Sequence, residues 1–158
     1  MEILKKLNHP NIVQIVEYFT QPNYLYIILE HIPGKSLHEL YYQEEIRNLD
    51  IIMNILRQVL IALKFCHEQG YVHKAVNPEH IIILKLEKSK SFLVKLVGFG
   101  RSLRKGAPKL SNKVVSAEPL FIAPEADNDL LTEKQDSWAC GIILLEMLTG
   151  EKKYENFL

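Results

Sequence analysis

The feature that most constrains the fold is an amphipathic segment between Asn48 and Gln69. Its apolar residues recur at helical spacing, so one face of a long helix has to be buried against other elements. Asn48 is a suitable N-cap for this helix and Gly70 a suitable stop. The predicted buried face consists of Ile52, Ile55, Leu56, Val59, Leu60 and Leu63. A chain of 158 residues is long enough to build one domain around such a helix.

Segments with strand character lie on both sides of this helix. Ile12–Phe19 and Tyr24–Glu30 are rich in Ile, Val and Tyr and are separated by a short polar turn, which predicts an antiparallel hairpin. Ile81–Leu86 and Phe92–Val97 flank a second polar turn and predict a second hairpin. Residues 98–125 are rich in Gly, Pro, Ser and Lys and are predicted to be mostly loop.

Three further helices are predicted. Residues 2–7 have apolar positions on one face, and the proline that follows ends the segment. Ser36 and Glu39 form a capping box, which accounts for Gly34-Lys35-Ser36 better than a phosphate-binding P-loop does, because Leu29 stands where that loop needs its first glycine. The segment Asp136–Leu148 is apolar on every side apart from Glu146, so we expect a helix buried in the core.

Composition and charge exclude several classes of protein. Lys plus Arg and Asp plus Glu both number 19, so the formal net charge is zero and nothing favours a nucleic-acid partner. Cys66 and Cys140 are far apart in apolar helical contexts, which predicts buried thiols and no zinc site. The N-terminus lacks a signal peptide, and the longest apolar run, Trp138–Leu145, is too short to span a membrane. We therefore expect an intracellular protein, most simply a cytoplasmic one.

Four short motifs follow one another along these elements. They are His73-Lys74-Ala75, Gly98-Phe99-Gly100, Ala123-Pro124-Glu125 and Asp136-Ser137-Trp138. In this order, with these elements between them, they resemble the eukaryotic protein-kinase domain of the serine/threonine type across nearly the whole chain. The resemblance implies an α+β fold in one partial domain, truncated at both ends. A remnant of the N-lobe, with the end of helix C and two antiparallel strands, and the hinge are expected over 1–31, and the helical C-lobe over 32–158.

The groups that transfer phosphate in that family are replaced here. The resemblance places Lys74 and Ala75 where the family has the arginine and the catalytic aspartate, and Asn77 where it has a lysine. The two magnesium ligands correspond to His80 and Gly98. No catalytic residue, bound metal or nucleotide is therefore expected.

Other matching positions are structural or vestigial. His73 and Phe99 match a hydrophobic spine, with Leu4 and Ile15 as its upper members, and Asp136 matches an aspartate that accepts hydrogen bonds from the catalytic-loop backbone. Glu125 and Trp138 are expected to be structural as well. A vestigial adenine pocket corresponds to Leu29, Glu30, Ile32 and Ile82, and candidate phosphorylation sites on the loop are Ser102, Ser111 and Ser116.

These replacements lead to three hypotheses. The first is a pseudokinase: a catalytically inactive kinase-like domain that acts as a protein-interaction or allosteric module in signalling. Its partner would be a protein, such as an active kinase or a signalling complex, with no nucleic acid or membrane involved. The second is a serine/threonine kinase with residual or partner-assisted activity, which would use ATP and magnesium. The third is a truncated kinase-like fragment without independent function.

Overall fold

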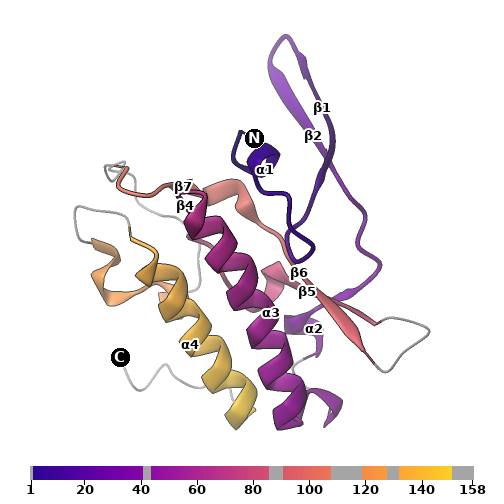
Figure 1. Cartoon of the computed structure of the whole chain (residues 1–158), viewed down its shortest axis with the longest axis vertical. Helices are drawn as coiled ribbons and strands as arrows, with labels where there is room; N and C mark the ends of the chain where they lie inside the picture. Colours follow the sequence, from indigo (N-terminus) through magenta and orange to yellow (C-terminus); the bar gives the residue numbers. More distant parts are fainter. Residues whose placement is uncertain (1, 41–43, 86–90, 108–118, 128–131, 151–158) are drawn as a thin grey trace.

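The computed structural model describes residues 2–40, 44–85, 91–107, 119–127 and 132–150. The predicted long helix is present as α3, Leu49–Glu68. Asn48 caps it as expected, because its side-chain oxygen accepts hydrogen bonds from the backbone N–H of Asp50 at 2.9 Å and of Ile51 at 3.4 Å. Figure 1 shows α3 at the centre of the molecule, beside α4, Lys134–Thr149.

The buried face of α3 lacks Leu60 and includes Ala62 and Cys66 in addition to the other residues predicted. Leu60 is 45% exposed, so its assignment to the core was wrong. The apolar residues of α3 cover more than one face, and their spacing alone does not tell which residues meet other elements. The residues of α3 that are buried are Ile52, Ile55, Leu56, Val59, Ala62, Leu63 and Cys66. Each large side chain among them stabilises the fold by about 1.5–3 kcal/mol relative to exposure.

Helix α4 is buried on one face and not on every side. Cys140, Ile143 and Met147 belong to the core, whereas Leu145 and Leu148 are 40% and 54% exposed. Glu146, the exception named in this segment, is itself buried, at 5% exposed. The expectation of a helix surrounded by core is therefore wrong, because the described elements that α4 packs against, mainly α3, leave its other face exposed.

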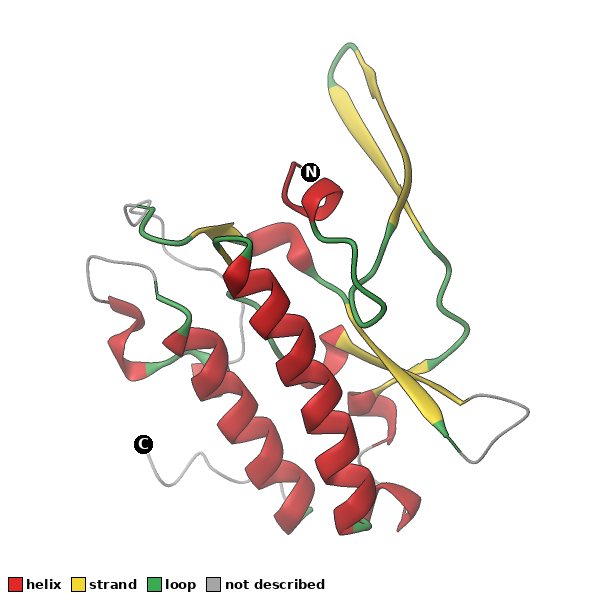
Figure 2. Cartoon of the chain, in the orientation of Figure 1, coloured by secondary structure: helices red, strands yellow, loops and turns green. Residues whose placement is uncertain are grey.

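A three-stranded sheet in the order β3-β5-β6 lies beside α3. Its main part is the predicted second hairpin, β5 (Ile81–Lys85) and β6 (Phe92–Leu96), with Ile83 opposite Val94. Figure 2 shows these strands beside the red helices. The edge strand β3, Lys35–Ser36, approaches β5 so closely that a Cβ at Gly34 would lie 2.5 Å from the Ile83 carbonyl oxygen. This close approach explains Gly34 without a phosphate-binding role.

The first predicted hairpin is present with shifted bounds. It consists of β1, Ile15–Gln21, and β2, Tyr24–Leu29, and it projects away from α3 and α4 (Figure 1). The strand begins later than predicted because Ile12 and Val13 bond to the other sheet: Ile12 forms a parallel bridge with Leu96, and the Val13 N–H donates to the Leu96 carbonyl. Both residues are buried there.

Shorter elements complete the described part of the chain. Ser36 and Glu39 form the predicted capping box, with the Glu39 N–H donating to Ser36 Oγ and the Ser36 N–H to Glu39 Oε2. The region 98–125 contains a strand that the sequence did not predict, β7, which pairs with β4. The short elements are α1 (Glu2–Lys6), α2 (Leu37–Leu40), β4 (Tyr71–Val72), β7 (Leu103–Arg104) and the 3-10 turns η1 (Glu44–Arg47), η2 (Pro78–His80), η3 (Phe99–Arg101), η4 (Pro119–Phe121) and η5 (Pro124–Asp127).

Candidate functional site

The loop from Tyr71 to His80 is held by one carboxylate on α4. Asp136 is 1% exposed and accepts hydrogen bonds from the backbone N–H of His73 and of Lys74, each at 2.8 Å. Its Oδ2 also lies 2.8 Å from Nε2 of His67 at the end of α3. Lys74 adopts a left-handed backbone with φ of 66°, a strained conformation that these bonds hold in place. The carboxylate therefore ties two helices and the loop together.

His73 is completely buried and has a defined tautomer. Its Nε2–H donates to the Val97 carbonyl at 2.9 Å, and its Nδ1 accepts from the Ala75 N–H at 3.2 Å. Its ring meets that of Phe99 edge to face, with centroids 4.4 Å apart. Burial lowers the pKa of His73 to about 4, although the negative charge of Asp136 acts in the opposite direction. This imidazole is therefore neutral near pH 7 and packs in the core.

Ala75 and Asn77, which follow Lys74 in the loop, carry no charged group. Ala75 presents a methyl group that is 8% exposed, and a methyl group cannot accept a proton. The side-chain oxygen of Asn77 accepts a hydrogen bond from the His80 N–H at 2.9 Å and so caps η2. Pro78 is the first residue of that turn. The polar atoms of the loop are thus used to stabilise its own backbone.

His80 occupies the space beside Gly98. Its Nδ1–H donates to the Ala75 carbonyl at 2.6 Å, which fixes the orientation of the ring. A Cβ added at Gly98 would lie 2.4–2.6 Å from three atoms of that imidazole. Gly98 also has a φ of 83°, which side chains rarely adopt. The observed position of the His80 ring therefore requires glycine at position 98, and any side chain at position 98 would require the ring to move.

This arrangement does not fit the magnesium ions that the resemblance implies. Magnesium prefers an octahedral set of oxygen ligands, and here the two positions in question provide an imidazole and a hydrogen atom. Among the residues that the structure describes, no three or more His, Cys, Asp or Glu side chains form a group able to hold a metal ion.

An ion pair that the sequence did not predict lies at the hinge between the hairpin and the rest of the molecule. Lys95 Nζ on β6 lies 2.5 Å from Glu30 Oε1, and the two side chains are 11% and 28% exposed. The same Glu30 oxygen accepts from the Gln14 N–H at 2.9 Å. A lysine in an otherwise apolar strand was the signal that could have indicated a buried acidic partner.

The other residues assigned to an adenine pocket differ in exposure. Leu29, at the end of β2, is 40% exposed, whereas Ile32 in the connector and Ile82 on β5 are partly buried. Ile82 stands opposite Lys95 in the sheet and opposite Ser36 in the edge strand.

The candidate phosphorylation sites are in different surroundings. Ser102 is 6% exposed and donates its hydroxyl proton to the His73 carbonyl at 3.2 Å, so this candidate is buried. It lies between η3 and β7. Ser111 and Ser116 lie outside the described residues.

Two remaining residues belong to the C-terminal part of the described chain. Trp138 on α4 donates from its indole nitrogen to the Leu120 carbonyl at 3.0 Å and thereby anchors η4. Glu125, in η5, is partly exposed.

A second network that the sequence did not predict joins α3 to β6. Gln58 Oε1 accepts from the Asn11 side-chain amide and from the Val94 N–H, both at 2.9 Å. Asn11 is 8% exposed and also donates to the Val94 carbonyl at 2.8 Å. These bonds fix the segment that leads into β1 against the sheet. Only the tertiary structure brings the three residues together.

The fold, the loop held by the carboxylate and the order of the motifs define a protein kinase domain. The family model described as "Protein kinase domain" matches residues 1–157, and the chain belongs to this family. The resemblance and the α+β fold inferred from the sequence are therefore confirmed.

Several curated protein kinases are similar to this chain. Calcium-dependent protein kinase 4 of Plasmodium falciparum (isolate 3D7) is 30% identical over 152 residues, which cover 95% of this chain and 28% of that protein. The calcium/calmodulin-dependent protein kinase type II alpha chain of Drosophila melanogaster is 29% identical over 149 residues, or 94% and 28% of the two chains. A probable myosin light chain kinase of Dictyostelium discoideum is 30% identical over 152 residues, or 95% and 38%. The chain thus spans less than two fifths of the length of these relatives.

Within the described residues, no helix combines the length and the apolar character needed to cross a bilayer.

Proposed function

We propose that this kinase domain is a non-catalytic, serine/threonine-kinase-like module that acts in signalling by binding another protein. The observation that carries the proposal is the packing of His80 against Gly98. The imidazole fills the volume that a carboxylate side chain at position 98 would need, since a Cβ there would lie 2.4–2.6 Å from the ring. One packing arrangement thus accounts for the loss of both magnesium-ligand positions.

The surrounding loop supports the same proposal. Ala75 has no group that could take the proton of a substrate hydroxyl, and the Asn77 amide is neutral and caps the next turn. Without a base and without bound cations, the charge that develops on a transferred phosphoryl group would lack its main stabilisation. At the same time, Asp136, His73 and Phe99 maintain the scaffold around the loop.

We further propose that neither ATP nor magnesium is a cofactor of this chain. Its partner is a protein, such as an active kinase or a signalling complex, and neither nucleic acid nor a membrane is involved. The place of action is inside the cell, most simply the cytoplasm.

Phosphotransfer and nucleotide binding test the proposal directly. We expect no incorporation of labelled phosphate into a generic serine/threonine substrate peptide with magnesium–ATP, and no ATP-induced rise in melting temperature with or without magnesium. Incorporation that a His80→Ala or Gly98→Ala substitution abolishes would overturn the proposal, because that dependence excludes a contaminating kinase. A clear ATP-induced rise in melting temperature would contradict the absence of a nucleotide site.

The second candidate function is residual or partner-assisted phosphotransfer to serine or threonine. The similarity to relatives whose names call them protein kinases favours it. If an active kinase partner is needed, labelled phosphate should appear only when the two proteins are mixed, and it should depend on residues 80 and 98 of this chain.

A further inference from the structure

Helix α3 carries apolar side chains that are exposed to solvent in addition to those that it contributes to the core. Met53, Leu60 and Ile61 are 52%, 45% and 37% exposed, although all three lie in the middle of a long packed helix. Together with their neighbours they line a surface groove of about 560 Å³. We call this hollow the α3 groove; its lining residues are Met53, Asn54, Leu56, Arg57, Leu60, Ile61 and Lys64.

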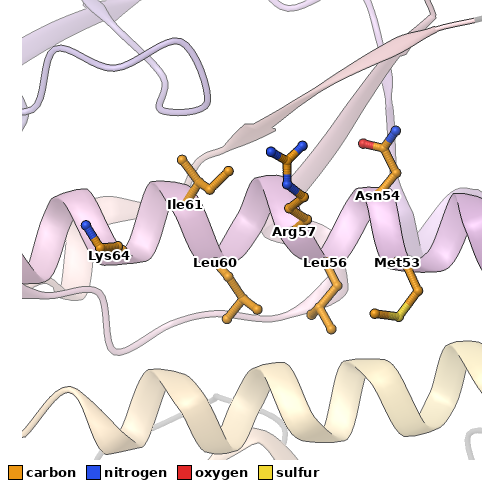
Figure 3. A pocket seen from close by; sticks show the side chains of 7 residues that line it. All are labelled: Met53, Asn54, Leu56, Arg57, Leu60, Ile61 and Lys64. Carbon is orange, nitrogen blue, oxygen red and sulfur yellow. The ribbon is translucent and has the colours of Figure 1, made fainter.

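The lining residues have the spacing of a helix-binding face. Met53 and Leu60 are seven residues apart, and Leu56 lies between them at the floor of the groove, which is the arrangement of apolar positions along a coiled-coil seam. Figure 3 shows these three side chains pointing to the same side of α3. An apolar groove with this repeat fits the apolar stripe of another helix.

Two cations accompany this apolar stripe. Arg57 and Lys64 both line the groove and are also seven residues apart. They occupy positions that in coiled coils pair with acidic residues of a partner helix. Lys64 is already 2.6 Å from Glu68, so its charge is partly balanced, while the guanidinium of Arg57 projects away from α3 in Figure 3. The acidic residues of the same helix, Asp50 and Glu68, lie beyond the ends of the groove.

This charge arrangement disfavours a second copy of the chain as the occupant. When two α3 grooves face each other in antiparallel register, Arg57 of one copy meets Lys64 of the other. In a parallel arrangement neither cation gains an acidic partner, because no Asp or Glu is among the residues that line the groove. Like charges in such positions are destabilising, whereas an acidic helix would pair with both cations.

We propose that the α3 groove binds an amphipathic helix of a partner protein, one with an apolar stripe flanked by acidic residues one heptad apart. This inference rests on the proposed role as an interaction module and names the surface and the partner chemistry of that role. It does not depend on the absence of phosphotransfer, so a kinase assay and a binding assay can fail separately.

A synthetic peptide provides the test. The probe is a fluorescent 21-residue peptide with Leu and Ile at the a and d positions and Glu at e and g, where the like charges keep it from pairing with itself. A second peptide carries Lys at e and g. Fluorescence anisotropy with the full 158-residue chain should give a Kd for the acidic peptide that is lower by about tenfold or more, the size expected from two favourable and two unfavourable surface ion pairs.

Charge reversal on the protein is the decisive control. The double variant Arg57→Glu/Lys64→Glu should bind the basic peptide in preference to the acidic one, which a merely misfolded protein would not do. Lys35→Glu reverses an exposed charge on β3 and should leave the preference unchanged. Leu60→Asp should weaken the binding of both peptides.

Three outcomes would overturn the inference. They are the absence of binding by either peptide, an unchanged preference in the double variant, and a stable dimer by sedimentation that Leu60→Asp dissociates. The last outcome would assign the groove to a second copy of the chain.

Discussion

At the scale of single residues, Asp136 on α4 joins the loop to the end of α3. It accepts from two backbone N–H groups and contacts His67, all at 2.8 Å. Asp136→Asn turns one acceptor into a donor that faces another donor, so we expect a loss of about 2–4 kcal/mol in the free energy of unfolding. Urea denaturation measures this loss, and Asp50→Asn, at an exposed position on α3, is the matched control. Equal losses in the two variants would contradict the anchoring role.

The buried imidazole of His73 predicts a pH dependence of stability. Its pKa is about 4 in the folded protein, below the ordinary value of 6.5 that applies after unfolding. At pH values between these two pKa values, the unfolded state binds a proton at His73 that the folded state does not. The contribution of His73 to the free energy of unfolding is therefore fully present above the unfolded-state pKa and is lost as the pH falls below it. From about pH 7 to about pH 5.5 this single group should remove about 1 kcal/mol.

The variant His73→Phe isolates this effect. It should be less stable, but its stability should change less over the same pH interval. His9, whose pKa is also lowered by burial and by the charge of Lys95, contributes in the same direction in both proteins. The exposed carboxylates Glu39 and Glu133 have lowered pKa values and act only at lower pH. Parallel pH profiles for the two proteins would contradict the prediction.

The contact between His80 and Gly98 predicts strong coupling between two substitutions. Gly98→Ala alone should cost about 2–4 kcal/mol, because the methyl group meets the ring and the backbone has a positive φ. In a His80→Asn background only the backbone term remains, so the cost should fall to about 1–2 kcal/mol. Chemical denaturation of the four proteins of this cycle measures the difference, and strict additivity would refute the contact.

At the scale of elements, the Lys95–Glu30 pair connects β6 to the segment that follows β2. Removing either partner should cost about 1–2 kcal/mol, because the pair is only partly exposed to water. The double variant Lys95→Met/Glu30→Gln should cost less than the sum of the single variants. This coupling energy is the measurement, and a value near zero would mean that the pair does not stabilise the hinge.

The elements also show what the sequence could predict. Helix α3 and the β5–β6 hairpin were predicted because their periodicity and turns are local properties of the chain. The Lys95–Glu30 pair and the bonds of Gln58 were not, since they join segments that only the tertiary structure brings together. The two-residue strand β7 was too short for any periodic signal. The burial of Ser102, which directly precedes this strand, had no local signal either.

At the site, family resemblance and geometry contributed different information. The order of the motifs identified His73, His80, Gly98 and Asp136 as positions of interest. It did not indicate that the ring of His80 would lie against Gly98, because side-chain orientation depends on the bond to the Ala75 carbonyl. Leu60 was assigned to the core because helical spacing cannot distinguish an apolar residue that packs from one that lines a surface groove.

At the scale of the whole molecule, stability should be unevenly distributed. The β1–β2 hairpin is a two-stranded sheet whose large apolar side chains, apart from Ile15, are 40–69% exposed. Such hairpins are marginally stable by themselves, whereas α3 contributes several completely buried residues to the core. Hydrogen exchange followed by mass spectrometry should therefore show amides of β1 and β2 exchanging well before those of α3. Equal protection of the two elements would contradict this prediction.

The packing of His80 on Gly98 also constrains the order in which this domain could change over time. A mutation that introduces a carboxylate at position 98 meets the imidazole unless residue 80 has been replaced first. The same mutation is therefore harmful in one genetic background and tolerable in another, which is epistasis between two sites. A change toward a metal-binding loop therefore requires an ordered sequence of steps, of which the first, the replacement of His80, brings no carboxylate to the site.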